Sequence, residues 1–204
     1  MTMINRLLRA ATVAKDRSGI AIVEFALLVP LLLTLFIGSF ETANLLLAYL
    51  KLEDAAETAA DLVAQWTSAT TVMQSTDFTN ITSAVQQVMS PLPTSGRLTI
   101  SYASITFSGC STTCTPKVDW VYPVGSTTFG AVGSTPANLP NGATTATLGT
   151  ANTDSFVVVQ LQYAYKSPVS YVLATNWTLT ESAFNRPRYL ACVPTYTNTN
   201  NTCP

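Results

Sequence analysis

The sequence predicts an α+β fold in which a long N-terminal helix, membrane-spanning in its first half, packs on a small antiparallel β-sheet. An apolar run fills residues 20–40, and apolar positions at helical spacing continue to residue 66. Alternating apolar and polar residues, which are typical of strands, appear only after residue 95. Helices followed by strands, without regular alternation between the two, favour α+β over α/β.

Residues 20–40 form the predicted membrane span. The run is interrupted only by Glu24, Pro30 and small residues, and its 21 positions extend about 31 Å as a helix, enough to cross a bilayer. Four of the ten basic residues precede it: Arg6, Arg9, Lys15 and Arg17. The acids that follow it are Glu41, Glu53, Asp54, Glu57 and Asp61. This charge asymmetry places the N-terminus in the cytoplasm.

The acid at Glu24 needs an explanation, because a carboxylate within a spanning helix costs a few kcal/mol on insertion scales. Neither a cleaved secretory signal, which would require a better small-residue site than residues 39–43 offer, nor a plain signal anchor accounts for it. Cleavage after Gly19 would place a new α-amine on Ile20, one helical turn from Glu24. The two charges would attract strongly in a poorly solvated site, and a neighbouring subunit could supply the amine equally well.

A basic leader, Gly19, an apolar Ile20, then Glu24 and Phe25 at the head of a long apolar helix resemble the cleavage region of type IV prepilins and pseudopilins. The longer string "VEFALLVPLLLTLFIG", followed by Glu41, resembles the TadE-like family, the pseudopilins or minor pilins of the tight-adherence (Tad or Flp) pilus system. The closest similarity covers about residues 17–60. The ending "LTESAFNRPRYL" is similar to family endings, though less specifically.

The resemblance implies that a prepilin peptidase cuts after Gly19, so that residues 1–19 are a removed cytoplasmic leader. Glu24 would then set the register between subunits, with Phe25 and Pro30 as further assembly residues. Other pilin or pseudopilin subunits, met through the N-terminal helix, and inner-membrane lipid are the implied partners. The implied location is the bacterial inner membrane, crossed once with the outer domain in the periplasm, or the cell exterior within a pilus.

The helix is predicted to continue through residues 41–66 as a periplasmic stalk. Its apolar positions recur at alternating intervals of four and three: Leu45, Tyr49, Leu52, Ala56, Ala59, Val63 and Trp66. This seam would pack on the protein's own domain, on other subunits, or on both at different heights. Pro30 predicts a kink or local unwinding near residue 26, because proline removes a backbone hydrogen bond.

Residues 67–204 form the predicted outer domain, an α+β unit whose arrangement is like that of pilins. A short helix is expected within residues 76–93, ended by Pro91. Strands are expected at residues 96–107, 117–124, 155–169 and 176–187. In the first strand the apolar phase shifts after Tyr102, as in a bulged strand, and in the second Val118, Trp120 and Tyr122 are aligned. Residues 125–153 read as a Thr/Gly-rich surface loop.

All four cysteines lie beyond the span, which fits disulfides in an oxidising compartment. The local pairs Cys110 with Cys114 and Cys192 with Cys203 are favoured among three possible pairings. A zinc site made of cysteines is an alternative, although the spacings are long for a zinc ribbon. Unpaired thiols are the third possibility.

The chain contains no histidine, which excludes imidazole catalysis, and no phosphate loop or metal-ligand spacing is present. We therefore expect no catalytic residues, no cofactor, no metal and no nucleic-acid partner. Asp119 and Glu181, expected on neighbouring strands, are read as solvated and not as a glycosidase pair. The three tryptophans, Trp66, Trp120 and Trp177, are read as core residues, with a sugar-binding surface as the alternative.

The sequence thus predicts a non-enzymatic pseudopilin that takes part in assembling or initiating a Tad pilus. The alternative is a membrane-anchored or pilus-tip adhesin that binds a surface or glycan through its outer domain. A periplasmic enzyme held by a permanent anchor is a third reading.

Overall fold

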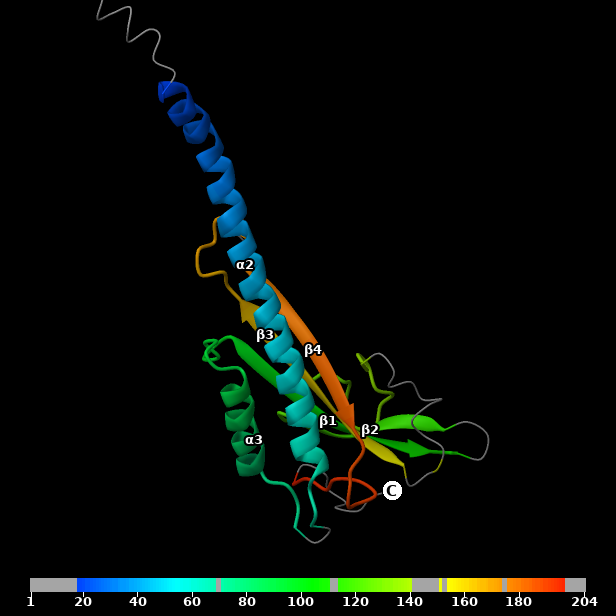
Figure 1. Ribbon diagram of the computed structural model, residues 1–204. Helices are drawn as coiled ribbons and strands as arrows, with labels where there is room; N and C mark the ends of the chain where they lie inside the picture. The colour runs from blue at the N-terminus through cyan, green and yellow to red at the C-terminus, as the bar shows by residue number, and fades with distance from the viewer. Residues whose placement is uncertain are drawn as a thin grey trace, which may run out of the picture. The chain divides into compact units, whose positions relative to one another are not determined.

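The computed structural model describes residues 18–68, 71–110, 114–140, 151, 154–173 and 176–196. Its elements are α2 (Ser18–Ala64), α3 (Ser75–Val88), β1 (Leu98–Ser108), β2 (Thr115–Tyr122), β3 (Ser155–Tyr165) and β4 (Trp177–Asn185), as Figure 1 shows. The predicted α+β class, a long N-terminal helix with a four-stranded antiparallel sheet, is confirmed. Of the predicted leader, residues 1–17 lie outside the described residues.

The chain divides into two compact units. The first comprises Met1–Asn44 and the segment Ser167–Thr175. The second comprises Leu45–Lys166 and Asn176–Pro204, and contains the whole sheet.

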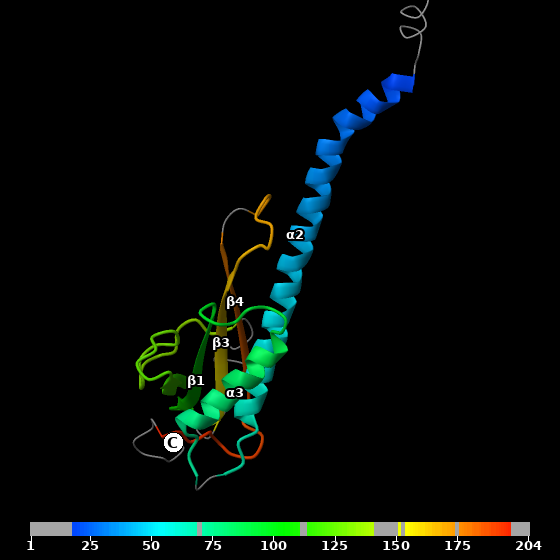
Figure 2. The same cartoon turned by 90° about the vertical axis from the view of Figure 1, so that its left-hand side faces the viewer.

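Helix α2 runs without interruption for 47 residues, and Pro30 lies inside it. Of the predicted kink or local unwinding near residue 26, the unwinding does not occur, and the helix axis bends within its N-terminal, blue part (Figure 2). One missing backbone donor costs a long helix a single hydrogen bond, and the turns on either side stay paired. The hydroxyl of Thr34 donates to the carbonyl of Pro30 at 2.8 Å. The helix ends at Ala64, two residues before the predicted end.

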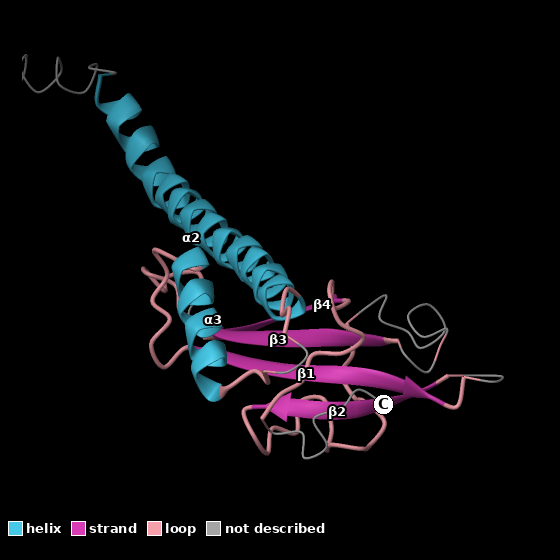
Figure 3. Ribbon diagram, turned by 90° about the horizontal axis from the view of Figure 1, so that it is seen from below, coloured by secondary structure: helices cyan, strands magenta, loops and turns pink. Residues whose placement is uncertain are grey.

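The sheet has the order β2-β1-β3-β4, with every neighbouring pair antiparallel (Figure 3). Strand β1 pairs with β3 in unbroken register from Leu98 to Thr106. The irregularity lies between β1 and β2, where Ser104 faces Trp120 but Ile105 faces Val118, so that Asp119 is the extra residue. The predicted bulge thus exists in β2 and not in β1.

The bulge corrects a second prediction, that Val118 shares a face with Trp120. The extra residue shifts the side-chain alternation of β2. Trp120 consequently joins the apolar cluster on the helix face of the sheet, and Val118 joins a cluster on the opposite face. The phase shift read in β1 needs no bulge: the strand alternates regularly, and Tyr102 and Ile105 belong to the cores on its two opposite faces.

On one face of the sheet lies the larger core, which is covered by α3 and by the second-unit part of α2 (Figure 3). Helix α2 contributes Ala48, Leu52, Ala55, Ala56, Ala59, Ala60 and Val63, all buried. Helix α3 contributes Phe78, Ile81 and Val85. The stalk seam therefore packs on the protein's own domain. Tyr49, predicted in the seam, is instead 41% exposed, and Ala48 takes its place.

On the other face a smaller core contains side chains of β1, β2 and β3 together with Phe129. Phe129 is fully buried, so the described half of the predicted surface loop covers the sheet. The next residue, Gly130, has φ of +98°, and a Cβ there would lie 2.9 Å from the Ser134 hydroxyl. Only glycine fits that turn without strain. The loop was predicted to run over the surface because most of its residues are small or polar. Its single buried aromatic residue, Phe129, does not stand out from that composition.

Candidate functional site

The first-unit part of α2 exposes large apolar side chains all round its circumference. They are Ile20, Ile22, Val23, Phe25, Leu27, Leu28, Leu31, Leu32, Leu33, Leu35, Phe36 and Phe40, each 49% exposed or more. Within the described residues α2 is the one helix long and apolar enough to cross a membrane. A helix that is apolar all round is stable only when lipid or other protein surrounds it.

Gly19 and Ile20 lie in the first turn of this helix. A Cβ built at Gly19 would meet nothing within 4 Å, and its backbone is helical. Neither packing nor backbone conformation therefore requires a glycine, which costs a helix interior about 1 kcal/mol relative to alanine. The presence of glycine at this position calls for another reason.

Glu24 lies one helical turn after Ile20, as the sequence predicts, and is exposed on the apolar helix. Among the described residues its carboxylate has no hydrogen-bond or ion-pair partner. Phe25 is 64% exposed, and Pro30 is also exposed. The proposed site residues are thus all uncovered, with Ile20 and Glu24 on one face of α2, and their roles in processing and assembly stay predictions.

Sequence reasoning used Glu41 as an acid following the span and as part of the family resemblance, and missed its structural role. Glu41 is fully buried within the first unit. Its carboxylate accepts three consecutive backbone N–H groups, from Tyr171 at 2.7 Å, Val172 at 2.9 Å and Leu173 at 2.6 Å. Successive N–H groups turned toward one anion form a nest. The charge is thereby solvated by the chain in place of water.

The electrostatics of Glu41 reflect two opposed effects. Desolvation by burial alone would raise the pKa of this carboxyl, but the hydrogen bonds from Leu173, Tyr171 and Val172 outweigh it. Together with a side-chain hydrogen bond from Ser167, they hold the pKa below its ordinary value of 4.5. Glu41 is therefore ionised at neutral pH. No motif in the sequence marks residues 167–173 as its partner, because a nest is built from backbone groups.

The three cysteines among the described residues, Cys110, Cys114 and Cys192, are all disulfide-bonded. Cys110 and Cys114 form a disulfide across the tip of the β1–β2 hairpin, as the local pairing predicts. Cys192 is also disulfide-bonded, and its predicted partner Cys203 lies outside the described residues. Thiols held in disulfides are not zinc ligands, so the alternative of a zinc site is wrong for this state. The described residues contain no group of three His, Cys, Asp or Glu that could hold a metal.

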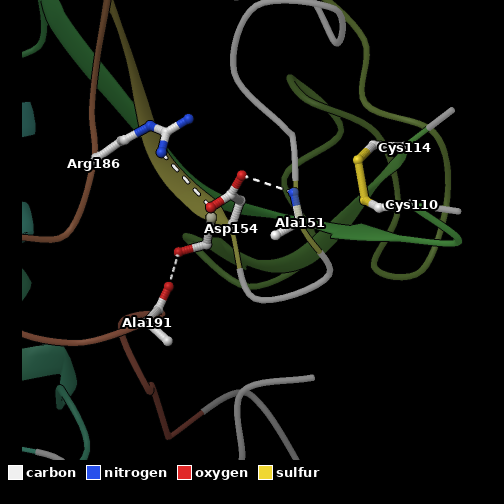
Figure 4. Close-up of polar contacts among 7 residues, drawn as sticks. Cys110, Cys114, Ala151, Asp154, Arg186 and Ala191 are labelled. Carbon is white, nitrogen blue, oxygen red and sulfur yellow. Dashed lines mark hydrogen bonds and ion pairs between the residues drawn. A yellow bond between two sulfur atoms is a disulfide. The ribbon is translucent and has the colours of Figure 1, made fainter. Parts of the chain in front are cut away.

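Figure 4 shows how the start of β3 is fastened near this hairpin. Asp154 accepts a hydrogen bond from the backbone N–H of Ala151 at 3.0 Å and forms an ion pair with Arg186 at 3.7 Å. The hydroxyl of the next residue, Ser155, donates to the carbonyl of Ala191. These polar groups tie the strand to the segment that follows β4, and their arrangement is structural.

The structure does not unite the groups considered for a glycan or glycosidase site. Asp119 lies on β2 and Glu181 on β4, which are opposite edge strands, and both are partly buried. The prediction that they lie on neighbouring strands is wrong, because β1 and β3 lie between them. Trp120 is fully buried and donates to the Val193 carbonyl at 2.7 Å, whereas Trp177 is 47% exposed.

A groove in the second unit is rich in acids. Helix α2 lines it with Glu53, Glu57 and Asp61, and the other wall carries Glu181 and Arg188. Arg188 forms an ion pair with Asp61 and donates its backbone N–H to the Ala64 carbonyl at 3.0 Å. Near this groove, the hydrogen bond and charge of Glu181 raise the pKa of the Tyr49 phenol. The two contacts of Arg188 across this groove fasten the stalk helix to the domain that contains the sheet.

The similarity to known proteins lies in helix α2. The family model described as TadE-like protein matches residues 19–61, which cover the span, Glu24 and Glu41. No curated protein and no solved structure matches the chain. An exposed apolar N-terminal helix and this family match are together consistent with a membrane-anchored protein associated with the Tad pilus. The match supports the identification of the chain as a TadE-like protein of Tad pilus systems.

Proposed function

We propose that the protein is a pseudopilin or minor pilin that takes part in assembling or initiating a Tad pilus. It is inserted in the inner membrane with its N-terminus in the cytoplasm and is cut after Gly19 by a prepilin peptidase. It is a substrate of that peptidase and not an enzyme. Other pilin subunits then meet it through the N-terminal helix.

The observation that carries this proposal is the uncovered N-terminal end of α2. It joins a glycine with no structural requirement, Gly19, to an unpaired acid one turn beyond the expected cut, Glu24. A peptidase that grips extended chain next to the scissile bond gains from a residue without a side chain. A carboxylate left unpaired in lipid is costly, so it awaits a partner.

The partner we propose is the α-amine created on Ile20, either of the same chain or of a neighbouring subunit. Both charges would then be neutralised in a medium where unscreened attraction is strong. The large side chains exposed around α2 provide apolar contact area between subunits, and the acid provides register.

The test begins with the mature N-terminus. Mass spectrometry of the protein purified from its native membrane is expected to find a chain that begins at Ile20, and Gly19→Val is expected to retain the leader. A wild-type chain with its leader intact would contradict processing.

The role of the acid is tested with Glu24→Ala and the neutral isostere Glu24→Gln. Both variants should be cleaved normally but yield far fewer pili, because the amine of Ile20 loses its counter-charge. The matched control is Asp54→Ala, which removes an exposed acid of the same helix beyond the span. Wild-type pilus yield from both Glu24 variants would refute the assembly role while leaving processing intact.

A further inference from the structure

The segment between β3 and β4 belongs by its contacts to the span and not to the sheet whose strands it joins. Residues 167–173 fall in the same compact unit as the helix up to Asn44, while both flanking strands fall in the other. The three N–H groups bound to Glu41 account for this grouping. We call these residues the 167–173 loop.

Internal hydrogen bonds hold the loop in a compact turn. The Ser170 hydroxyl donates to the Ser167 carbonyl at 2.8 Å, and the Ser170 N–H donates to the Ser167 hydroxyl at 3.3 Å. Ser170 adopts a positive φ of 56°, uncommon for a residue with a side chain. Ser167 is buried and also hydrogen-bonds Glu41, so the turn and the nest share one residue.

Apolar side chains project from this turn without cover. Val169 is 50% exposed, Tyr171 is 63% exposed and Val172 is 49% exposed. Three exposed apolar residues within four positions form a contiguous patch, which a soluble surface avoids unless something binds there.

Gly38, which lies within the apolar run one turn before Glu41, sets the level of Val172, and Tyr171 is the neighbouring residue along the chain. A Cβ at Gly38 would touch the Val172 side chain at 3.5 Å. At about 1.5 Å of rise per residue, Val172 therefore reaches back about 4.5 Å from Glu41 toward the membrane interior. The loop thus overlaps the end of the span, where lipid headgroups meet acyl chains.

We infer that the 167–173 loop is a second membrane contact, fastened to the span by Glu41, and that it immerses Val169 and Tyr171 in the interfacial layer of the bilayer. This inference rests on the proposed function, because it requires α2 to span a membrane. Tyrosine suits this layer since its ring is apolar and its hydroxyl is polar. Glu41 satisfies three of the loop's backbone donors and the Ser167 hydroxyl a fourth, which reduces the cost of placing irregular chain at a membrane surface.

The test uses the full chain in lipid vesicles with an environment-sensitive fluorophore on a single introduced cysteine. Probe positions are Tyr171→Cys and, as a second site in the same loop, Val169→Cys. Leu32→Cys reports the middle of the span, and Tyr189→Cys is the matched control, because Tyr189 is 67% exposed in the second unit. The wild-type chain, taken through the same labelling, gives the blank.

Nitroxide lipids labelled at the headgroup or in mid-chain then quench each probe according to its depth. The inference expects the loop probes to be quenched best by headgroup-level nitroxide, the Leu32 probe by mid-chain nitroxide and the Tyr189 probe by neither. Glu41→Gln should weaken quenching of the loop probes, because its amide oxygen is a weaker acceptor than the carboxylate, and leave Leu32 unchanged, whereas Asp54→Asn should change neither.

Three results would overturn the inference. If the loop probes behave like Tyr189 while Leu32 is quenched, the loop is not at the membrane and the proposed function stands. If Leu32 is also unquenched, the span fails, and the membrane part of the proposed function fails with the loop. If the loop probes shift only with protein concentration and not with nitroxide lipid, a second copy of the chain covers the patch.

Discussion

Two glutamates on α2 illustrate how one residue type takes opposite environments. Glu24 is exposed and has no partner among the described residues, whereas Glu41 is fully buried and accepts three backbone hydrogen bonds. The first acid is suited to a partner that arrives later. The second is already satisfied within its own chain, so its role is to hold a loop.

The lowered pKa of Glu41 makes the hold on the loop dependent on pH. A carboxyl whose folded pKa lies below its ordinary 4.5 stabilises the fold fully above that value and loses this effect as pH falls through the folded pKa. Hydrogen exchange at the Tyr171, Val172 and Leu173 amides, corrected for intrinsic rates, should therefore stay slow at neutral pH and accelerate below about 4.5.

Glu41→Gln should remove this dependence, because the amide side chain does not titrate in that range. The same amides should then exchange roughly tenfold faster or more at neutral pH, since hydrogen bonds to a charged acceptor are about twice as strong as neutral ones. Protection in Glu41→Gln equal to the wild type would show that the carboxylate does not hold the loop.

At the scale of elements, the stalk half of α2 is built for close approach. Ala55, Ala56, Ala59 and Ala60 are 0–1% exposed against the sheet and α3. These small side chains let the helix backbone lie close to the sheet and α3. A larger side chain at the same position would therefore clash with them. The seam was predicted from the spacing of apolar residues. That prediction was wrong by one residue at Tyr49, where the preceding residue, Ala48, is the buried one.

Ala59→Leu should destabilise the second unit by about 1–3 kcal/mol, because overpacking forces neighbours off their rotamers. Denaturant unfolding of the full chain in detergent measures this cost. The control is Ala43→Leu, at an exposed position of the same helix, which should change stability by no more than about 0.5 kcal/mol. Equal stabilities for the two variants would mean that the stalk does not pack tightly on its sheet.

At the scale of the whole molecule, the chain separates an apolar, uncovered first unit from a second unit with cores on both faces of a sheet. We expect the first to be the membrane part and the second to lie outside the cytoplasm. Disulfides at Cys110 and Cys192 agree with an oxidising compartment for the second unit.

Protease added outside intact spheroplasts should therefore digest the second unit and leave the span protected. Mass spectrometry of the membrane fraction would identify the surviving fragment. A second unit that resists until the membrane is lysed would place it in the cytoplasm and reverse the proposed orientation.

The sequence by itself indicated the apolar span, the stalk, and the helix and four strands that follow, and it favoured the Cys110–Cys114 pairing that the structure shows. These features depend on the local periodicity of apolar residues or on short spacings between residues. Both can be read from the sequence without knowing the tertiary structure. It also marked Gly19, Ile20 and Glu24 through a linear motif.

Only the tertiary structure decided which features meet across the chain. The strand order separates Asp119 from Glu181, and the bulge at Asp119 turns Val118 away from Trp120. The nest joins Glu41 to backbone groups 130 residues later. Backbone N–H groups are the same in every residue, so the sequence does not mark which of them bind Glu41. Contacts between distant residues depend on how the sheet and helices pack, which the sequence pattern does not reveal.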